Sequence, residues 1–237
     1  MSFLSQSVVA VIPISEADTD FAGGQMPQLG GRALLEYTFR AARESRLVDR
    51  LIVSTDSARI AETCKASGID APFVRPPELA NPNVPITEVL RYTLEWLREH
   101  EHTEPDWVAM LSVTYPFRPK GFVDAFIQTV LPEDLDSAFA AIEERHSHWV
   151  LREGEQPELV SFGADVAKAH RRPLFRELSG LMSMAKRETI LAGNLYGQKL
   201  AIIPAHDARS TVNVHDPIGH QFAELLAPRF LENDRVE

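Results

Sequence analysis

Apolar positions along this chain follow two alternating patterns, which predict strands separated by helices. Continuous apolar and β-branched runs are typical of strands buried on both faces, and we expect such strands at 7–13, 49–55, 71–76, 107–113, 136–144 and 198–204. Apolar residues spaced three and four apart indicate amphipathic helices, which we expect at 33–45, 57–68, 85–100, 121–130 and 218–231. Asp56 is expected to cap the helix that begins at 57, Gly68 to end it, and Cys64 to lie in the core.

Strands that alternate with helices of this length predict βαβ units. The expected fold class is therefore α/β, a Rossmann-like, doubly wound and mostly parallel sheet. The pattern changes at 146–162, where two apolar stretches flank Glu153 and Gly154 and predict a hairpin that projects from the sheet. A short strand and turn are expected at 211–217. We expect one domain over 1–237, with 147–184 as an excursion from the main sheet.

Composition narrows the class of protein. The chain has 237 residues and a net charge of −10, and without a basic face it does not fit a general nucleic-acid binder. Cys64 is the one cysteine, which excludes an internal disulfide and a CxxC zinc site. No apolar run approaches the roughly 20 residues of a membrane span, and the first residues lack the features of a signal peptide. We therefore expect a cytoplasmic protein with no membrane partner.

Histidines and arginines in the second half of the chain raise two further possibilities. His146 and His148 would point to the same side of a strand, as in some metal sites. No third ligand is evident in the sequence, so a structural role is favoured. The stretch His170 to Arg172 is densely basic. It is either a solvated loop or a contact for a phosphate or an acidic sugar, the latter including a contact that enters the partner's cleft in a dimer.

Several segments, taken together, resemble the acylneuraminate cytidylyltransferase family. They are "VVAVIP", "LGGRALLEYTFRAARESRLVDRLIVSTDSARIAE", "GIDAPFVRPPELA", "VTYPFRPKGFVDAF" and "STVNVHDPIGHQFAELL". Members of this family, the CMP-sugar synthetases, join CTP to an acidic sugar and release pyrophosphate. The resemblance implies a nucleotide-diphospho-sugar transferase type of sheet. It also implies a homodimer that exchanges an arm, and 147–184 would be that dimerisation and substrate arm.

The opening loop departs from the pattern of this family, which is R-x-G-S-K-x-x-P-x-K-N followed by Gly-Gly. Ser15 stands at the arginine, Thr19 and Gly24 stand at the two lysines, and Gln25 stands at the asparagine. The loop instead carries Glu16, Asp18 and Asp20. Three lost cations would cost triphosphate binding roughly 4–9 kcal/mol if their contributions added. Backbone amides around Gly23 and Gly24 offer only a partial replacement as an anion nest.

The metal site that the resemblance implies is also altered. Family members end a strand with Asp-x-Asp, which holds Mg²⁺ against the phosphates. Here Asn213 and His215 stand at those positions, and Asp216 comes one residue later. Because Mg²⁺ prefers carboxylate oxygens and water, this is a weaker site. A softer metal at His215 and Asp216 is one alternative, and a turn with a helix cap is the other.

The loop after the strand at 107–113 keeps part of the family motif Q-P-T-S-P-x-R. Thr114 and Arg118 are retained, whereas Ser112 replaces the glutamine. The motif N-G-x-x-Y, expected after an arginine–glutamate pair near 176–183, has neither its asparagine nor its tyrosine. By resemblance Arg75 and Arg118 would line the nucleotide pocket. A surface role for each arginine is the alternative.

Three functions follow as hypotheses. The first is a nucleotidyltransferase in which Ser15, Thr19, Gly23, Gly24 and Gln25 receive the nucleotide of CTP, with Arg75, Thr114 and Arg118 beside it. In that case Asp216, helped by Asn213 or His215, would hold Mg²⁺. The second is a catalytically lapsed homologue that serves as a dimeric binding or regulatory protein. The third is a transferase for a substrate with less phosphate charge, which would suit an acidic loop.

Overall fold

The computed structural model describes residues 6–16, 26–81, 83–161, 163 and 166–233. Its centre is a seven-stranded sheet whose main path runs β11-β6-β10-β5-β1-β4. The strands of the main path are β1 (Val8–Ile14), β4 (Arg50–Thr55), β5 (Trp107–Met110), β6 (Ser137–Glu144), β10 (Ser183–Lys186) and β11 (Leu200–Pro204). The seventh strand, β9 (Leu174–Glu177), pairs with β6. Strand β1 is parallel to both β4 and β5, and β11 is parallel to β6. β10 runs antiparallel to its two neighbours. The predicted mostly parallel α/β sheet is confirmed.

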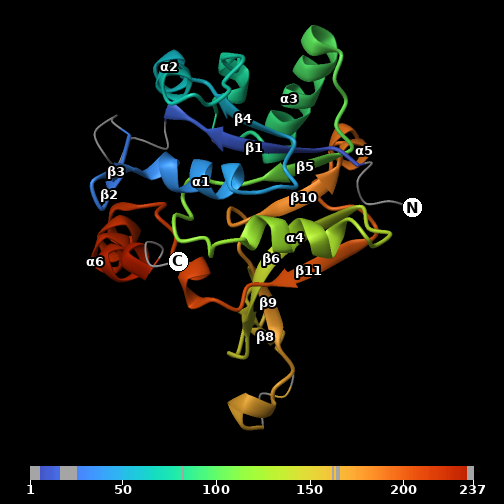
Figure 1. Ribbon diagram of the computed structural model, residues 1–237. Coiled ribbons are helices and arrows are strands. Elements are labelled where there is room, and N and C mark those ends of the chain that lie inside the picture. Colours follow the sequence, from blue (N-terminus) through green and yellow to red (C-terminus); the bar gives the residue numbers. More distant parts are fainter. Residues whose placement is uncertain (1–5, 17–25, 82, 162, 164–165, 234–237) are drawn as a thin grey trace.

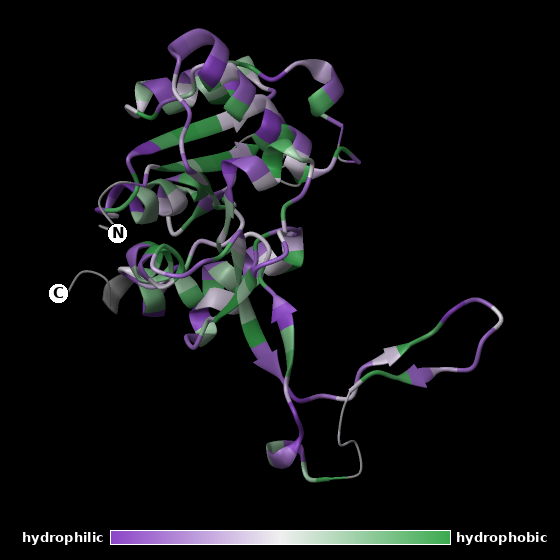
Figure 2. Ribbon diagram, turned by 90° about the vertical axis from the view of Figure 1, so that its right-hand side faces the viewer, coloured by the Kyte–Doolittle hydropathy of each residue, from purple (hydrophilic) through white to green (hydrophobic). Residues whose placement is uncertain are grey.

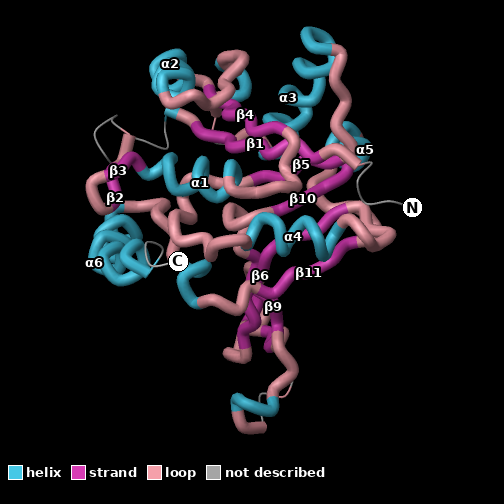
Figure 3. Tube along the Cα trace, viewed as in Figure 1, coloured by secondary structure: helices cyan, strands magenta, loops and turns pink. Residues whose placement is uncertain are grey.

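Helices cover both faces of this sheet (Figures 1 and 3). They are α1 (Leu34–Arg43), α2 (Ala58–Ala66), α3 (Ile86–Glu101), α4 (Phe122–Val130), α5 (Arg187–Leu191) and α6 (Pro217–Asn233). Helices α1, α2 and α4 bury side chains in one core cluster, whereas α3 and α5 pack in a second cluster on the opposite face. Helix α6 packs away from the sheet, against the short hairpin of β2 (Gln28–Leu29) and β3 (Arg32–Ala33).

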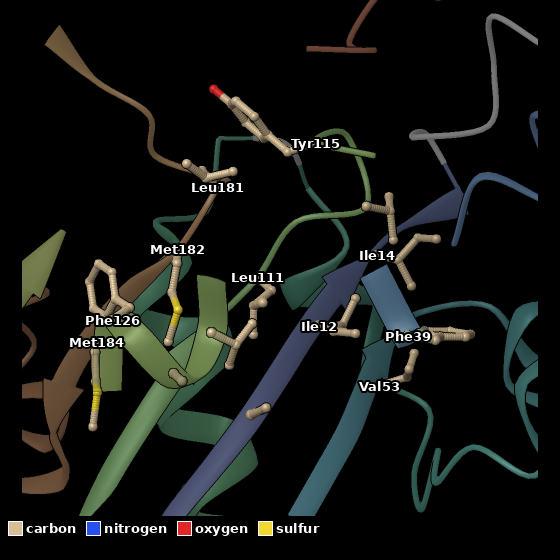
Figure 4. Packing of buried hydrophobic residues seen from close by; sticks show 14 of the residues in the cluster. Ile12, Ile14, Phe39, Val53, Leu111, Tyr115, Phe126, Leu181, Met182 and Met184 are labelled. Atoms are coloured by element: carbon tan, nitrogen blue, oxygen red, sulfur yellow. The ribbon is translucent and has the colours of Figure 1, made fainter. Parts of the chain in front are cut away.

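Strand β1 shows why its apolar run is continuous. Ala10 and Ile12 belong to the cluster beneath α1, and Val9 and Val11 belong to the cluster beneath α3. Successive side chains of a strand point to opposite faces, so a strand covered on both sides needs apolar residues throughout. Figure 4 shows Ile12 and Ile14 beside Phe39 and Val53 in the first cluster.

Three local predictions were wrong. Helix α2 is capped by Ser57, whose side chain accepts a hydrogen bond from the backbone N of Ile60 at 3.4 Å, and not by Asp56. The segment 71–76 makes one isolated bridge, between Thr55 and Val74, and no regular strand. The segment 211–217 contains no strand. Its chain leaves a 3-10 helix, η5 (Ala208–Thr211), and joins the loop after β5 by one backbone bond, from Val214 N to Thr114 O at 2.8 Å.

The residues between β6 and β9 (Leu174–Glu177) leave the body of the molecule, and we call residues 145–173 the arm. It contains the antiparallel pair β7 (Trp149–Val150) and β8 (Glu158–Leu159), as the alternation around Gly154 predicts, and the 3-10 helix η4 (Lys168–His170). Figure 2 shows this hairpin extending far from the sheet. Strands β9 and β10 pair with β6, so the chain from Leu174 onward belongs to the main sheet.

A long bulge separates β9 from β10. Glu177 lies opposite Ala141 and Ser183 lies opposite Phe139. The chain advances six residues from Glu177 to Ser183 while β6 advances only two, from Ala141 to Phe139. The β9–β10 segment therefore has four extra residues. Bulges re-aim side chains and are frequent beside active sites. Within this one, Leu178, Leu181 and Met182 are fully buried, whereas Ser179 is exposed. Among the described residues, no helix is long and apolar enough to cross a membrane.

Candidate functional site

A cleft of about 690 Å³ opens across the carboxyl ends of the central strands. This is the edge of a doubly wound sheet at which ligands usually bind. Its polar and charged lining residues are Ser15, Arg75, Asn81, Ser112, Thr114, Tyr115, Glu177, Ser179, Tyr196, Asn213 and His215. Apolar residues from α3 and its approach, among them Val84, Ile86 and Val89, form another wall. The cleft thus gathers Ser15, Arg75, Thr114, Asn213 and His215 from four separate segments of the chain.

Arg75 lies at one end of the cleft and is only 5% exposed. Its guanidinium donates to the carbonyl oxygens of Ser54, the penultimate residue of β4, and of Ile14 at 3.5 Å. One carboxylate oxygen of Asp56 lies 3.9 Å from Nη2. Arg75 therefore ties the ends of β1 and β4 together and brings a buried positive charge to the edge of the cleft, with Asp56 as its counter-charge.

Arg118 has a different place from the one the resemblance implies, since it is not among the residues that line this cleft. Its guanidinium lies beneath the cleft and makes five hydrogen bonds. The acceptors, at 2.7–2.8 Å, are the carbonyl oxygens of Leu181, Tyr115, Ser112 and Gly180 and the hydroxyl of Thr38. Burial lowers the pKa of Arg118 to about 9, so the side chain is still cationic at neutral pH. Arg118 fastens the loop after β5 to the bulge before β10.

The floor of the cleft is built from these two fastened segments. The hydroxyls of Ser112 and Thr114 lie 2.9 Å apart, and Ser112 N donates to Gly180 O at 2.8 Å. A Cβ added at Gly180 would lie 2.6 Å from the Cβ of Ser112 and 2.8 Å from the ring of Tyr115, which explains the glycine. Burial raises the pKa of Tyr115, although a hydrogen bond with Asn213 opposes this. In Figure 4 the hydroxyl of Tyr115 points away from the apolar cluster.

Glu177 and Tyr196 are among the cleft residues that were not predicted from the sequence. The hydroxyl of Tyr196 donates to Oε1 of Glu177 at 2.6 Å. Partial burial and the nearby carboxylate both raise the pKa of Tyr196, so the phenol stays protonated at neutral pH. The one sequence signal for Glu177 was its place in the arginine–glutamate pair, Arg176 and Glu177, that precedes the altered family motif. No sequence spacing links it to Tyr196, because the two meet through the tertiary structure.

The residues expected to bind a metal do not lie together in the cleft. Asn213 and His215 line it, whereas Asp216 is not among the lining residues. Oδ1 of Asp216 accepts a hydrogen bond from Gly219 N at 2.7 Å and so caps the first turn of α6. In the described part of the chain, no group of three His, Cys, Asp or Glu side chains forms a metal site. An amide and an imidazole fit the hard oxygen coordination of Mg²⁺ poorly.

The opening loop is described only in part. Thr19, Gly23, Gly24 and Gln25 lie outside the described residues, and so do Asp18 and Asp20. Glu16 forms an ion pair with Arg59 at 2.7 Å. Hydrogen bonds from Ser57 and Arg59 lower the pKa of Glu16. The negative charge of Glu16 is thus balanced by α2.

The two histidines at the root of the arm have separate partners. Nε2 of His146 lies 2.7 Å from Nζ of Lys168, and Nε2 of His148 lies 3.1 Å from Oε2 of Glu144. This arrangement does not form a shared metal site. The stretch His170 to Arg172 lies on the arm, and none of its residues is among those that line the cleft of the same chain.

A doubly wound sheet with a ligand-sized cleft at its carboxyl edge is typical of α/β proteins that bind nucleotides. Residues 21–160 match the family described as "Cytidylyltransferase", and the chain belongs to this family. The match begins after Ser15 and Thr19, so this part of the altered opening loop lies outside it.

Curated relatives agree with this assignment. The chain is 29% identical over 113 residues to CMP-N,N'-diacetyllegionaminic acid synthase of Legionella pneumophila, a match covering 47% of each chain. It is 22% identical to the N-acylneuraminate cytidylyltransferase of Escherichia coli, over 91% of this chain and 51% of that protein. The chain thus spans about half the length of these relatives.

Solved structures share the fold. A CMP:2-keto-3-deoxy-manno-octonic acid synthetase complexed with CTP matches with a TM-score of 0.68 at 14% identity, over 94% of this chain and 99% of that one. The 4-diphosphocytidyl-2C-methyl-D-erythritol synthase of Anaerococcus prevotii matches with a TM-score of 0.66 at 12% identity, over the same shares of the two chains.

Proposed function

We propose that this protein transfers a cytidylyl group from CTP to an acidic sugar and releases pyrophosphate. The observation that carries the proposal is the cleft at the carboxyl edge of the sheet, which brings Ser15, Arg75 and Thr114 together in a member of the cytidylyltransferase family. A hydroxyl of the sugar attacks the α-phosphorus of CTP. The bond from that phosphorus to the oxygen bridging the α- and β-phosphates breaks, and pyrophosphate leaves.

Arg75 and the ends of β1 and β4 form the nucleotide end of the cleft in this proposal. Arg75 supplies positive charge there, in a buried setting where charge acts more strongly than in water. Ser112, Thr114 and Ser179 supply hydroxyls, and Asn213 an amide, for the ribose and the phosphates. Arg118 acts as a positioning residue, because its hydrogen bonds hold Ser112 and Gly180 in place.

A catalytically lapsed homologue is disfavoured. A purely regulatory homologue that binds no small molecule has no need of an open cleft, yet the described residues retain one of about 690 Å³, and pyrophosphate release separates an enzyme from a homologue that only binds. Loss of the loop cations predicts weaker binding of the triphosphate, but it does not predict loss of the whole site. We therefore expect catalysis with a high KM for CTP.

Any Mg²⁺ in this reaction is held, in our proposal, chiefly by the phosphates of the nucleotide. The side chains at the expected metal position are an amide and an imidazole, and Asp216 is engaged at the start of α6. We expect the metal requirement to follow the concentration of the metal–nucleotide complex. A protein-held ion would instead saturate independently of CTP.

We also propose that the protein is a homodimer joined through the arm. Trp149 is 61% exposed and Leu151 is 74% exposed on the projecting hairpin. Val166 and Phe175 add further exposed apolar surface. Large apolar side chains exposed together on one projection mark sites of protein association. A second copy would cover it, and the basic residues 170–172 would then be available to the partner's cleft.

The central experiment measures pyrophosphate release. Each of the four common nucleoside triphosphates is offered with Mg²⁺ or Mn²⁺ and with N-acetylneuraminate, 3-deoxy-manno-octulosonate or N,N'-diacetyllegionaminate as acceptor. We expect release with CTP and one of these sugars. Calorimetric titration with CTP accompanies the assay, and no detectable binding at millimolar CTP would refute the proposal.

A double substitution tests the opening loop separately. Ser15→Arg with Thr19→Lys restores two of the expected cations, so CTP should bind at least tenfold more tightly. Ser15→Gln with Thr19→Gln is the control of similar size without charge. An unchanged dissociation constant for CTP in the charged variant would mean that the loop no longer contacts the triphosphate.

A further inference from the structure

Glu177 stands out in the cleft because it is the one carboxylate among the described lining residues. It ends β9, at the point where the bulge begins. Its Oε1 accepts the hydrogen bond from Tyr196, whose ring packs edge-on against Phe139 with centroids 5.5 Å apart. The neighbouring Arg176 donates instead to Glu144 at 2.6 Å. The side chain of Glu177 is thereby oriented by a neutral partner.

Glu177 lies far from the cationic end of the cleft. Arg75 donates to carbonyl oxygens of β1 and β4, whereas Glu177 pairs with β6. Strand β9 lies on the same side of β6 as β10, because the backbone N and O of Ala140 bond to Met182 and Leu178, so β5 alone separates this line of chain from β1. Two spacings between neighbouring strands amount to roughly 10 Å. A nucleotide at the Arg75 end therefore leaves room for a second substrate at the Glu177 end.

The chemistry of the Glu177 end suits hydroxyl groups better than phosphates. A carboxylate repels phosphate oxygens, but it accepts strong hydrogen bonds from hydroxyls. Ser179 and Tyr196 line the cleft together with Glu177 and add two more hydroxyls. Paired donors and acceptors of this kind fit a polyhydroxylated ligand.

We propose that Glu177, held in place by Tyr196, binds a hydroxyl group of the acceptor sugar and so selects and positions that sugar. The inference rests on the proposed function and adds to it the orientation in which the acceptor sugar binds. An acidic sugar enters with its hydroxyl-bearing part against Glu177, and its own carboxylate faces the Arg75 end. Glu177 is a specificity-determining residue in this scheme, and Tyr196 is a positioning residue.

The test is Glu177→Gln, which keeps the size of the side chain and an oxygen for the Tyr196 hydroxyl but removes the charge. We expect the KM of the active sugar to rise about tenfold or more, with CTP affinity by calorimetry changed less than twofold. Tyr196→Phe keeps the carboxylate and should raise the same KM by a smaller factor. Glu143→Gln is the matched control, since Glu143 is exposed on β6 and does not line the cleft.

Analogues of the sugar that lack a single hydroxyl identify the contact. One of them should bind the native protein and Glu177→Gln equally well, because the group that Glu177 recognises is missing. An unchanged sugar KM in Glu177→Gln would overturn the inference while pyrophosphate release still supports the proposed function. Should the native protein release no pyrophosphate, direct calorimetric titration with 3-deoxy-manno-octulosonate and N-acetylneuraminate decides. Tenfold weaker binding to Glu177→Gln supports the inference, and equal or absent binding overturns it.

Discussion

Replacing Arg118 with methionine separates a structural role for this arginine from a role in the nucleotide pocket. The substitution keeps most of the apolar stem and removes the guanidinium. Ser112 O and Gly180 O keep other donors, namely Thr38 Oγ1 at 3.1 Å and Ser112 N at 2.8 Å. Leu181 O and Tyr115 O, by contrast, have Arg118 as the one hydrogen-bond donor given by the described residues.

The magnitude follows from those two carbonyl groups. Leaving a buried acceptor without a partner costs about 1–3 kcal/mol, so Arg118→Met should lose roughly 2–6 kcal/mol of unfolding free energy. For a chain of this size, each 1 kcal/mol lowers the melting temperature by about 2–4 °C. We therefore expect a decrease of roughly 4–24 °C.

Urea unfolding followed by circular dichroism measures this loss, with Arg152→Met as the control. Arg152 forms exposed ion pairs with Glu155 and Glu158 on the arm, and such pairs contribute about 0–1 kcal/mol. If Arg118→Met unfolds within 1 kcal/mol of the native protein yet loses CTP affinity, the structural account is refuted. The pocket-lining role implied by the resemblance would then be correct.

Three further predictions concern other parts of the molecule. Gly180→Ala should destabilise the fold by about 1–3 kcal/mol, because the added Cβ would lie 2.6 Å from the Cβ of Ser112. An unchanged melting temperature would contradict this and show that the bulge moves to accommodate the methyl group. The pKa of Glu101 is lowered chiefly by its hydrogen bond from Arg50, so the stability this pair provides is complete above about pH 4.5 and is lost as the pH falls through the lower folded value. Unfolding free energies of Arg50→Met should accordingly fall less steeply below pH 4.5 than those of the native protein, and parallel curves would contradict this. Trp149→Glu should shift sedimentation from dimer to monomer, and a native protein that already sediments as a monomer would refute the arm-mediated dimer.

Local patterns in the sequence were enough to predict most of the framework. The continuous apolar run of β1 and the three–four spacing of α3 report which faces of each element are covered, and this information is local. The hairpin in the arm follows for the same reason. The sequence also placed Thr114 after a buried strand, and residues that follow parallel strands meet at one edge of the sheet, where Thr114 lines the cleft.

Contacts between distant segments decided the rest. Arg75 and Arg118 both follow apolar stretches of sequence, but the bulge before β10 surrounds Arg118 with carbonyl oxygens and takes it out of the cleft. Asp216 follows its expected metal partners in sequence, yet its carboxylate binds the first turn of α6. Glu177 and Tyr196 meet only because β6 pairs with β9 and packs Phe139 beneath the tyrosine. Periodicity along a chain reports burial, whereas the partner of a polar group depends on which other segments the fold places beside it.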